Sequence, residues 1–338
     1  MRKKSIKLNK GAALLLSLFI TSIVSIIGYR LFDLTIFTSE IEKRYISNQQ
    51  SLLLALSLES YTLDFISSEE RRRSLSLMTN RYDPYSPIEI PIERGNVLAQ
   101  IEDKSDCFNL NLLVTNKKEI NKKILNKEEL KLFKNLLISL EIPDERVEII
   151  SASLIDWIDY DDFPDNYNGA EDFYYSNLKV PYLPFNGYLR SITEIRQVKG
   201  ILEDDYKKMS PYICALPINI KSININSISP LKPKLLIALS ENKLSDQEAT
   251  YILENRPLNG YEDLNDFFND EAIKRVVTSK FAREKLTVDP FYFNLKTQIK
   301  YDEFTFIMNS RLLKDNEGMR IITRKVGSLL WVNLFIFF

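Results

Sequence analysis

Apolar residues are distributed unevenly along the chain, and the longest apolar run lies near the N-terminus. From Ala12 to Phe32 the polar interruptions are Ser17, Thr21, Ser22, Ser25, Tyr29 and Arg30. A helix rises about 1.5 Å per residue, so this run can cross a hydrocarbon core of roughly 30 Å. Five cations and no acidic residue precede it: Arg2, Lys3, Lys4, Lys7 and Lys10. The positive-inside rule therefore predicts a cytoplasmic N-terminus and an exported remainder.

Three interpretations of this segment remain open. A secretory signal peptide has an apolar region of about 7 to 15 residues and a small-x-small cleavage site after it. Here the run is longer, and RLFDLTIFTSEIEKRY offers no such site. An uncleaved single-pass anchor explains the run without further assumptions. In the third interpretation, the order of basic leader, Gly11 and apolar helix resembles the prepilin signal of type IV pilins and pseudopilins, in which the helix is kept after cleavage.

The helical pattern continues beyond the apolar run. Residues 33–67 contain no proline or glycine, and apolar residues recur there at mostly helical spacing: Ile41, Tyr45, Leu52, Leu56, Tyr61, Leu63 and Phe65. This predicts one helix over residues 12–67. Residues 68–96 contain EERRR and then Pro84, Pro87 and Pro91, which predicts a loop with short extended pieces.

Two amphipathic helices are predicted next, in KEELKLFKNLLISLEI and PDERVEIISASLIDWIDYDD. The second ends in a cluster of seven carboxylates within seventeen residues: Asp156, Asp159, Asp161, Asp162, Asp165, Glu171 and Asp172. These charges repel one another, and a hard cation would relieve the repulsion. Calcium takes about six to eight oxygen ligands, although this spacing is not that of an EF-hand loop. The alternative is a solvated acidic loop.

Further motifs predict short helices and then strands. Ser191 with Glu194, three residues later, is a capping box for a helix that ends by Gly200. Ser245 begins another helix, which Arg256 and Pro257 end, and a further one starts between residues 261 and 268. INIKSININ alternates like a strand but also suits a helix entry. Alternation in LTVDPFYFNLKTQIKYDEFTFIMNSRLL and GMRIITRKV predicts half-buried antiparallel strands.

Composition excludes several function classes. The chain of 338 residues has no histidine, which removes histidine bases, Ser-His and Cys-His nucleophiles and imidazole metal sites. Without the five leader cations, 40 Lys and Arg face 46 Asp and Glu, a net charge near −6 that disfavours a basic nucleic-acid surface. Cys107 and Cys214 either form one disulfide or are two small buried thiols. Their separation in the sequence does not decide between these alternatives, so both stay open.

The order of several strings resembles one known family. FNLNLLV, LIDWIDYDDFPDNYNGAEDFYYSNL, SITEIRQVKGI, ININS and ILENRPLNGYEDLNDFF occur as in the general secretion pathway protein K family, the largest minor pseudopilins of type II secretion. The resemblance covers roughly residues 11 to 325. It implies cleavage between Gly11 and Ala12 by the prepilin peptidase. Leu16 would then be the fifth mature residue, where most pseudopilins carry glutamate. In the family this glutamate pairs with the N-terminal amine of a neighbouring subunit. A chain with leucine at this position has no carboxylate to offer a subunit above it, which suits the topmost subunit of a filament.

The resemblance also implies an α+β fold. A pilin-like long N-terminal helix packs on a small antiparallel sheet, and a large helical domain, similar to SAM and helix-hairpin-helix modules, is inserted between strands. The expected division is a leader at 1–11, the first helix at 12–67, the first strands at 68–106, the inserted domain at 107–270, the remaining strands at 271–328 and an apolar tail at 329–338.

The implied function is structural rather than enzymatic: a tip subunit of the periplasmic pseudopilus that takes part in protein export. Expected partners are the prepilin peptidase, the inner membrane and minor pseudopilins of types I, J and H, with the secretin or cargo as further contacts. By resemblance the acidic loop binds calcium, with Asp159, Asp161, Glu171 and Asp172 as expected ligands.

The main rival interpretation is a membrane-anchored helix-hairpin-helix module of DNA uptake, because ININS and ILENRPLNGYEDLNDF also fit that pattern. Such modules contact phosphate through a glycine-containing hairpin, since only glycine lets the backbone approach so closely. The corresponding segment here, ENKLSDQE, has no glycine and lies in acidic surroundings. We therefore expect no nucleic-acid partner. A plain membrane-anchored interaction protein is the other alternative.

Overall fold

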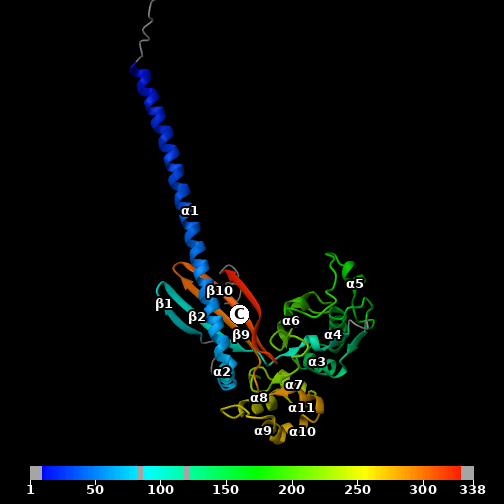
Figure 1. The fold of residues 1–338 in the computed structure, drawn as a ribbon. Coiled ribbons are helices and arrows are strands. Elements are labelled where there is room, and N and C mark those ends of the chain that lie inside the picture. The colour runs from blue at the N-terminus through cyan, green and yellow to red at the C-terminus, as the bar shows by residue number, and fades with distance from the viewer. Residues whose placement is uncertain (1–9, 82–86, 118–121, 329–338) are drawn as a thin grey trace, which may run out of the picture.

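The chain consists of one very long helix, a five-stranded sheet and a helical domain, as seen in a computed structural model (Figure 1). The structure describes residues 10–81, 87–117 and 122–328. Helix α1 (Lys10–Ser67) is continuous, as the sequence predicts. Its first part extends away from the rest of the molecule with apolar side chains exposed, and the segment contains a window of mean hydropathy 2.2. It is long and apolar enough to cross a bilayer.

The second part of α1 packs on the sheet through one face. Buried residues recur there about every four positions, which is the helical repeat: Ser47, Ser51, Ala55, Glu59, Thr62 and Ile66. The buried carboxylate of Glu59 forms an ion pair with Arg324, with 2.7 Å between Oε1 and Nη2. These contacts hold α1 against the sheet.

A second helix, α2 (Glu69–Arg81), follows α1 after a bend, so the prediction of a loop from residue 68 is wrong for this part. The cause is tertiary. The buried guanidinium of Arg72 donates to the carbonyl oxygens of Ile66 at 3.0 Å and Pro290 at 2.9 Å. It thus satisfies a carbonyl that the end of α1 leaves without an intrahelical partner. The charged run forms a helix because the buried Arg72 bonds it to the end of α1 and to the segment before β9.

The sheet is antiparallel, with the strand order β1-β2-β9-β10-β11. Its strands are β1 (Ile88–Ile92), β2 (Gly95–Asp103), β9 (Tyr292–Tyr301), β10 (Phe304–Asp315) and β11 (Gly318–Ser328). Residues of β9 alternate between buried and half-exposed, and Phe293 and Leu295 pack with Ile66 of α1. The predicted strands and the pilin-like arrangement of helix on sheet are confirmed.

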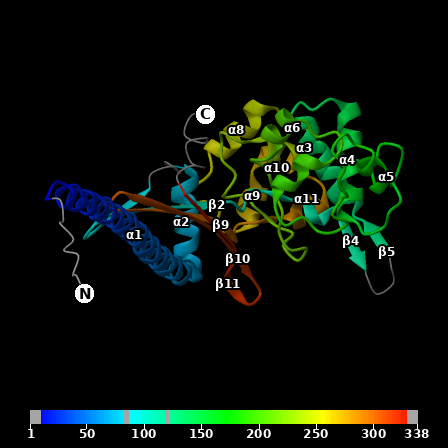
Figure 2. The same cartoon turned by 90° about the horizontal axis from the view of Figure 1, so that it is seen from above.

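The helical domain lies between β2 and β9, beside the sheet (Figures 1 and 2). Its helices are α3 (Lys127–Ser139), α4 (Asp144–Ile158), α5 (Asp172–Ser176), α6 (Glu203–Met209), α7 (Lys234–Leu239), α8 (Asp246–Glu254), α9 (Leu264–Asn269), α10 (Glu271–Val276) and α11 (Lys280–Lys285), with 3-10 turns η1 (Leu110–Leu112) and η3 (Ile192–Gln197). One core runs from Phe108 to Val288. The expected end of this domain at residue 270 is therefore too early, because α10 and α11 contribute Ile273 and Ala282 to that core.

Short strand pairs complete the helical domain. They are the parallel pairs β3 (Phe108–Asn109) with β6 (Ile213–Cys214) and β7 (Ile223–Asn224) with β8 (Leu286–Thr287), and the antiparallel pair β4 (Val114–Lys117) with β5 (Lys122–Leu125). The alternating INIKSININ forms only the two-residue β7. The capping boxes of Ser191 and Ser245 are both present, although the first caps the 3-10 turn η3, which ends at Gln197.

Buried polar contacts join the helical domain to the pilin-like part. The Asp103 carboxylate at the end of β2 accepts hydrogen bonds from Ser76 of α2 and from Ser227 of the helical domain. Cys107 and Cys214 form a disulfide, with Cα atoms 5.7 Å apart, which settles the alternative that the sequence leaves open. The hydrogen bonds of Asp103 therefore join the two parts at the point where the chain enters the insertion, and the disulfide links two segments within the helical domain. The apolar tail of residues 329–338 lies outside the described residues.

Candidate functional site

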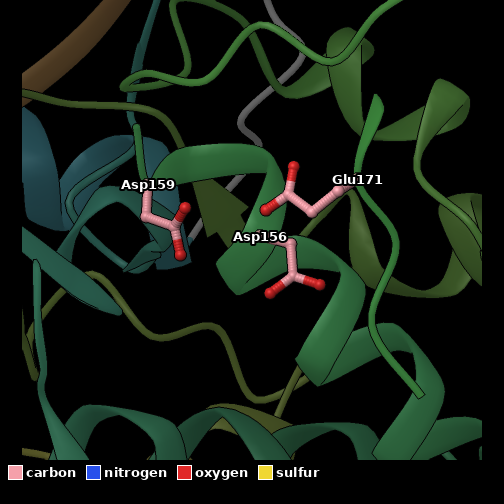
Figure 3. Close-up of side chains that lie close together, drawn as sticks. All are labelled: Asp156, Asp159 and Glu171. Atoms are coloured by element: carbon pink, nitrogen blue, oxygen red, sulfur yellow. The ribbon is translucent and has the colours of Figure 1, made fainter. Parts of the chain in front are cut away.

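Three buried carboxylates meet at the C-terminal end of α4 (Figure 3). Asp156 is in the last turn of α4, Asp159 follows its end, and Glu171 precedes α5. One oxygen from each lies within 4.8 Å of the others. Within the described residues, this is the one group of three or more acidic or cysteine side chains close enough to share an ion.

The loop between α4 and α5 is folded around Asp156. Its carboxylate accepts hydrogen bonds from the backbone N–H of Asp165 at 2.9 Å and of Ala170 at 2.7 Å. From the other side, Lys199 Nζ donates to the carbonyl oxygens of Asn168 at 3.0 Å and Gly169 at 2.9 Å. These bonds bring Glu171 back to the end of α4.

Two of the four predicted ligands belong to this group, and two lie outside it. Asp159 and Glu171 are in the cluster. Asp161 is half-buried and its Oδ1 accepts the backbone N–H of Phe163 at 3.1 Å, and Asp172 is the half-buried first residue of α5. Asp156 is the member that the predicted set omits. The sequence gives no signal that sets Asp156 apart from the neighbouring carboxylates, because Asp159 already lies beyond the end of α4 in an extended conformation.

Aromatic side chains pack beside the cluster. Trp157 and Tyr175 meet edge to face with ring centroids 5.3 Å apart, and Tyr175 also contacts Tyr182. The buried Tyr175 hydroxyl accepts the backbone N–H of Lys199 at 3.2 Å, and burial raises the pKa of this tyrosine. The three carboxylates are themselves buried, so the repulsion between their charges is stronger than in water.

The helix-hairpin-helix segment lacks the feature that binds phosphate. Between α7 and α8, Glu241 and Asn242 both have a φ of 59°, a conformation that favours glycine. The carboxylate of Glu241 bonds to Lys131 at 2.6 Å. A negatively charged side chain thus occupies the turn whose glycine approaches phosphate in DNA-binding modules, so the likeness is one of fold.

Comparison with known proteins agrees with this architecture. The family described as "Type II secretion system (T2SS), protein K" matches residues 106–218 and, in a second part, residues 223–289. The protein K of Pectobacterium carotovorum is 28% identical over 325 residues, covering 96% of this chain and 98% of the relative. A putative protein K of Escherichia coli K12 is 30% identical over 313 residues, covering 87% and 90%.

A solved structure has the same fold. It is the GspK-GspI-GspJ complex of enterotoxigenic Escherichia coli, with a TM-score of 0.67 and 26% identity, covering 86% of this chain and 99% of the matched chain. Long helix, antiparallel sheet and inserted helical domain thus define a minor pseudopilin, a structural component of a secretion apparatus. The chain belongs to the type II secretion system protein K family. The DNA-uptake and plain-anchor alternatives have no support from these relatives.

Proposed function

We propose that this protein caps the tip of the periplasmic pseudopilus. The observation that carries the proposal is the place of the helical domain, which lies at the end of the molecule opposite the start of α1 (Figure 1). With the start of α1 in a membrane, the domain lies beside the sheet, and its part around α9 and α10 extends beyond the sheet, away from the bilayer (Figure 1). A bulky insertion there leaves little room for another subunit above it. Leu16 supports the same position, since it offers no carboxylate to a subunit above.

We further propose a single-pass protein of the inner membrane with its N-terminus in the cytoplasm. One apolar helix, the cations before it and the disulfide support this arrangement, because disulfides persist in oxidising compartments such as the periplasm. The prepilin peptidase would cut between Gly11 and Ala12. The membrane half of α1 would then pack against neighbouring pseudopilin helices.

The partners of this subunit would be the other minor pseudopilins of its own system. The related GspK was solved with GspI and GspJ. We propose equivalent contacts here with types I and J, and further contacts with type H, made through α1 and the periplasmic part. The secretin and the exported proteins are the proposed contacts of the tip.

The buried cluster suits a calcium ion. Asp156, Asp159 and Glu171 offer hard oxygen ligands, and their mutual repulsion in a buried site falls when a divalent cation binds. Carbonyl oxygens of the surrounding loop are further donors of the same kind. Asp161 and Asp172 remain predicted ligands. A bound ion would hold the loop to α4, which is a structural role.

The test of the tip function is complementation. Cells of the native host that lack this gene are expected to retain the exported proteins in the periplasm, and the full chain is expected to restore these proteins to the medium. Full-length protein, co-expressed with the type I and J pseudopilins and extracted in mild detergent, should co-purify with both. A Leu16→Glu variant should still co-purify but restore export poorly. Normal export in the deletion strain would contradict the proposal.

A further inference from the structure

One edge of the sheet presents exposed apolar side chains on the same side as α1. In the edge strand β1, Ile88 is 65% exposed and Ile90 is 40% exposed. The register pairs these two residues with Ala99 and Val97 of β2. Directly paired residues lie on the same face of a sheet, and Val97 packs in the cluster that contains Ala55 of α1. Ile88 and Ile90 therefore face the side on which α1 lies, at a place that α1 leaves exposed.

One flank of α1 borders these two isoleucines. The ion pair of Glu59 with Arg324 shows that Glu59 faces the β11 edge of the sheet. Successive helical residues are turned by about 100°, so Leu54 and Leu58 lie on the opposite flank, toward β1 and β2. Both leucines are partly buried against the same cluster. Figure 1 shows β1 and β2 extending past α1 on this side. We call the four residues Leu54, Leu58, Ile88 and Ile90 the lateral face.

The lateral face runs along α1, because α1 lies along the strands. Ala55 packs with Ile299 near one end of β9, and Ile66 packs with Phe293 near the other. Between these contacts α1 rises about 16 Å and β9 spans about 20 Å, so the two axes are nearly parallel. Strand β1 belongs to the same sheet and follows the same direction. A partner that covers the lateral face would thus lie alongside α1.

The edge of β1 is closed to a partner strand. In an antiparallel strand, the backbone groups of alternate residues point toward the paired strand and away from it. A two-residue turn joins Ile92 to Gly95, so the isoleucines of β1 point toward β2. Glu89 and Pro91 then point away, as does Pro87 just before the strand, and proline has no N–H to donate to a further strand. An occupant of the lateral face must therefore pack through side chains, as a helix does.

We propose that the lateral face docks the first helix of a neighbouring pseudopilin, which lies beside α1 and runs in the same direction. The inference rests on the proposed function, which places the start of α1 in the inner membrane among other pseudopilins. A neighbour of the same fold sends its first helix out of the same bilayer, so that helix runs along α1 and along the lateral face. The bilayer itself does not reach this face, since Leu54 stands about 33 Å of helix beyond Phe32.

Photo-crosslinking in cells tests the occupant. Ile88 or Ile90 is replaced by p-benzoylphenylalanine in the full chain, which is expressed in the native host together with its other pseudopilins. Mass spectrometry of the crosslinked products should identify the first helix of another pseudopilin. The same photoreactive residue at Glu89 is the matched control, because Glu89 is exposed on the opposite face of β1. It should give few crosslinks to that helix.

A double variant measures what the lateral face contributes. Ile88→Ser, Ile90→Ser should reduce the pseudopilin that co-purifies with the full chain in mild detergent about tenfold, because burial of these isoleucines on binding is lost. The control Leu231→Ser, Leu258→Ser changes two leucines of the helical domain that are 91% and 73% exposed. It should co-purify the partner as the unaltered chain does. The crosslinks decide the question if the double variant is less stable.

Several outcomes would overturn the proposal. Crosslinks from positions 88 and 90 to residues 329–338 of the same chain would make the apolar tail the occupant. Equal crosslinking of the partner helix from position 89, no crosslinks from positions 88 and 90 while pseudopilins co-purify, or full co-purification with a stable double variant would also contradict it. If no pseudopilin co-purifies with the unaltered chain, the proposed partners themselves are wrong and the inference falls with them.

Discussion

Gly169 lies directly against the carboxylate of Asp156. A Cβ atom at Gly169 would stand 2.0 Å from Asp156 Oδ2 and 3.0 Å from its Cγ. The same oxygen accepts the backbone N–H of Ala170 at 2.7 Å. The glycine therefore allows the loop to approach α4 closely enough to place Glu171 beside Asp159. The arrangement of the three carboxylates therefore depends on the absence of a side chain at Gly169.

Substitution Gly169→Ala should consequently destabilise the loop. The buried carboxylate at the end of α4 has little room to move, and an added methyl group in such a packed place typically costs about 1 to 3 kcal/mol. Thermal unfolding of the full chain in detergent would measure the loss. Gly327→Ala is the control, since no atom lies within 4 Å of the Cβ it would add. Equal melting temperatures for the two variants would contradict this account of Gly169.

Calcium should raise the melting temperature of the protein, and chelation should lower it. Asp159→Asn and Glu171→Gln each remove a charge from the buried cluster, so we expect both to abolish the calcium-dependent shift while raising the stability of the calcium-free protein. Asp161→Asn and Asp172→Asn, outside the cluster, should keep most of the shift. If these two variants abolish it as well, the wider set of ligands predicted from the sequence is correct. An absent shift in the unaltered chain would remove the calcium proposal.

The sequence predicts the elements that local pattern determines and misses those that depend on distant contacts. Helix α1 is predictable because its apolar run is long and contains no proline. Helix α2 is not, since its charged residues are helical through the buried contacts of Arg72 with Pro290. The family resemblance includes Asp159 and Glu171 in its expected ligand set, and the structure places both in the buried cluster. Asp156 could not be distinguished from its neighbours, because only the approach of Gly169 shows which carboxylates are buried together.

The disulfide should contribute strongly to stability. It closes a loop spanning 107 positions, and constraining the unfolded chain over such a length typically contributes about 2 to 5 kcal/mol. The Cys107→Ala, Cys214→Ala variant should unfold at a lower urea concentration, followed by the fluorescence of the buried Trp157. Reductant should lower the midpoint of the unaltered protein and leave that of the variant unchanged. A midpoint that does not respond to reductant in the unaltered protein would show that the bond does not stabilise the fold.

Asp106, beside the disulfide, should make stability depend on pH. Burial raises the pKa of this carboxyl to about 7, with Asp103 adding to the shift and Lys104 and Lys232 opposing it. The folded protein therefore binds a proton more tightly than the unfolded chain, whose carboxyl has its ordinary pKa of 3.8. Stability from this group is greatest below that value, falls as pH rises toward 7 and is constant above.

The variant Asp106→Asn isolates this contribution. It removes the titrating group, so melting temperature should fall less between pH 4 and pH 7 than in the unaltered protein, and the variant should be the more stable of the two near neutral pH. Asp263→Asn changes an exposed helix cap instead and should leave the slope in this window unchanged. Parallel melting curves for the Asp106 variant and the unaltered chain across this window would show that Asp106 is not the group responsible.

A buried ion pair between α3 and α11 gives the sharpest test of the core. Lys285 Nζ lies 2.6 Å from both carboxylate oxygens of Glu129, and both side chains are buried. Desolvation lowers the pKa of Lys285 and raises that of Glu129, so each charge depends on the other.

Glu129→Gln leaves an ammonium group without its counter-charge and should cost about 3 to 5 kcal/mol of stability. The double variant Glu129→Leu, Lys285→Met should be close to neutral or more stable, because the buried charges disappear together. Lys131→Gln breaks the exposed pair with Glu241 and should change stability by about 0 to 1 kcal/mol. Urea unfolding of the three variants measures these differences, and a double variant as unstable as Glu129→Gln would show that packing rather than charge pairing determines the cost.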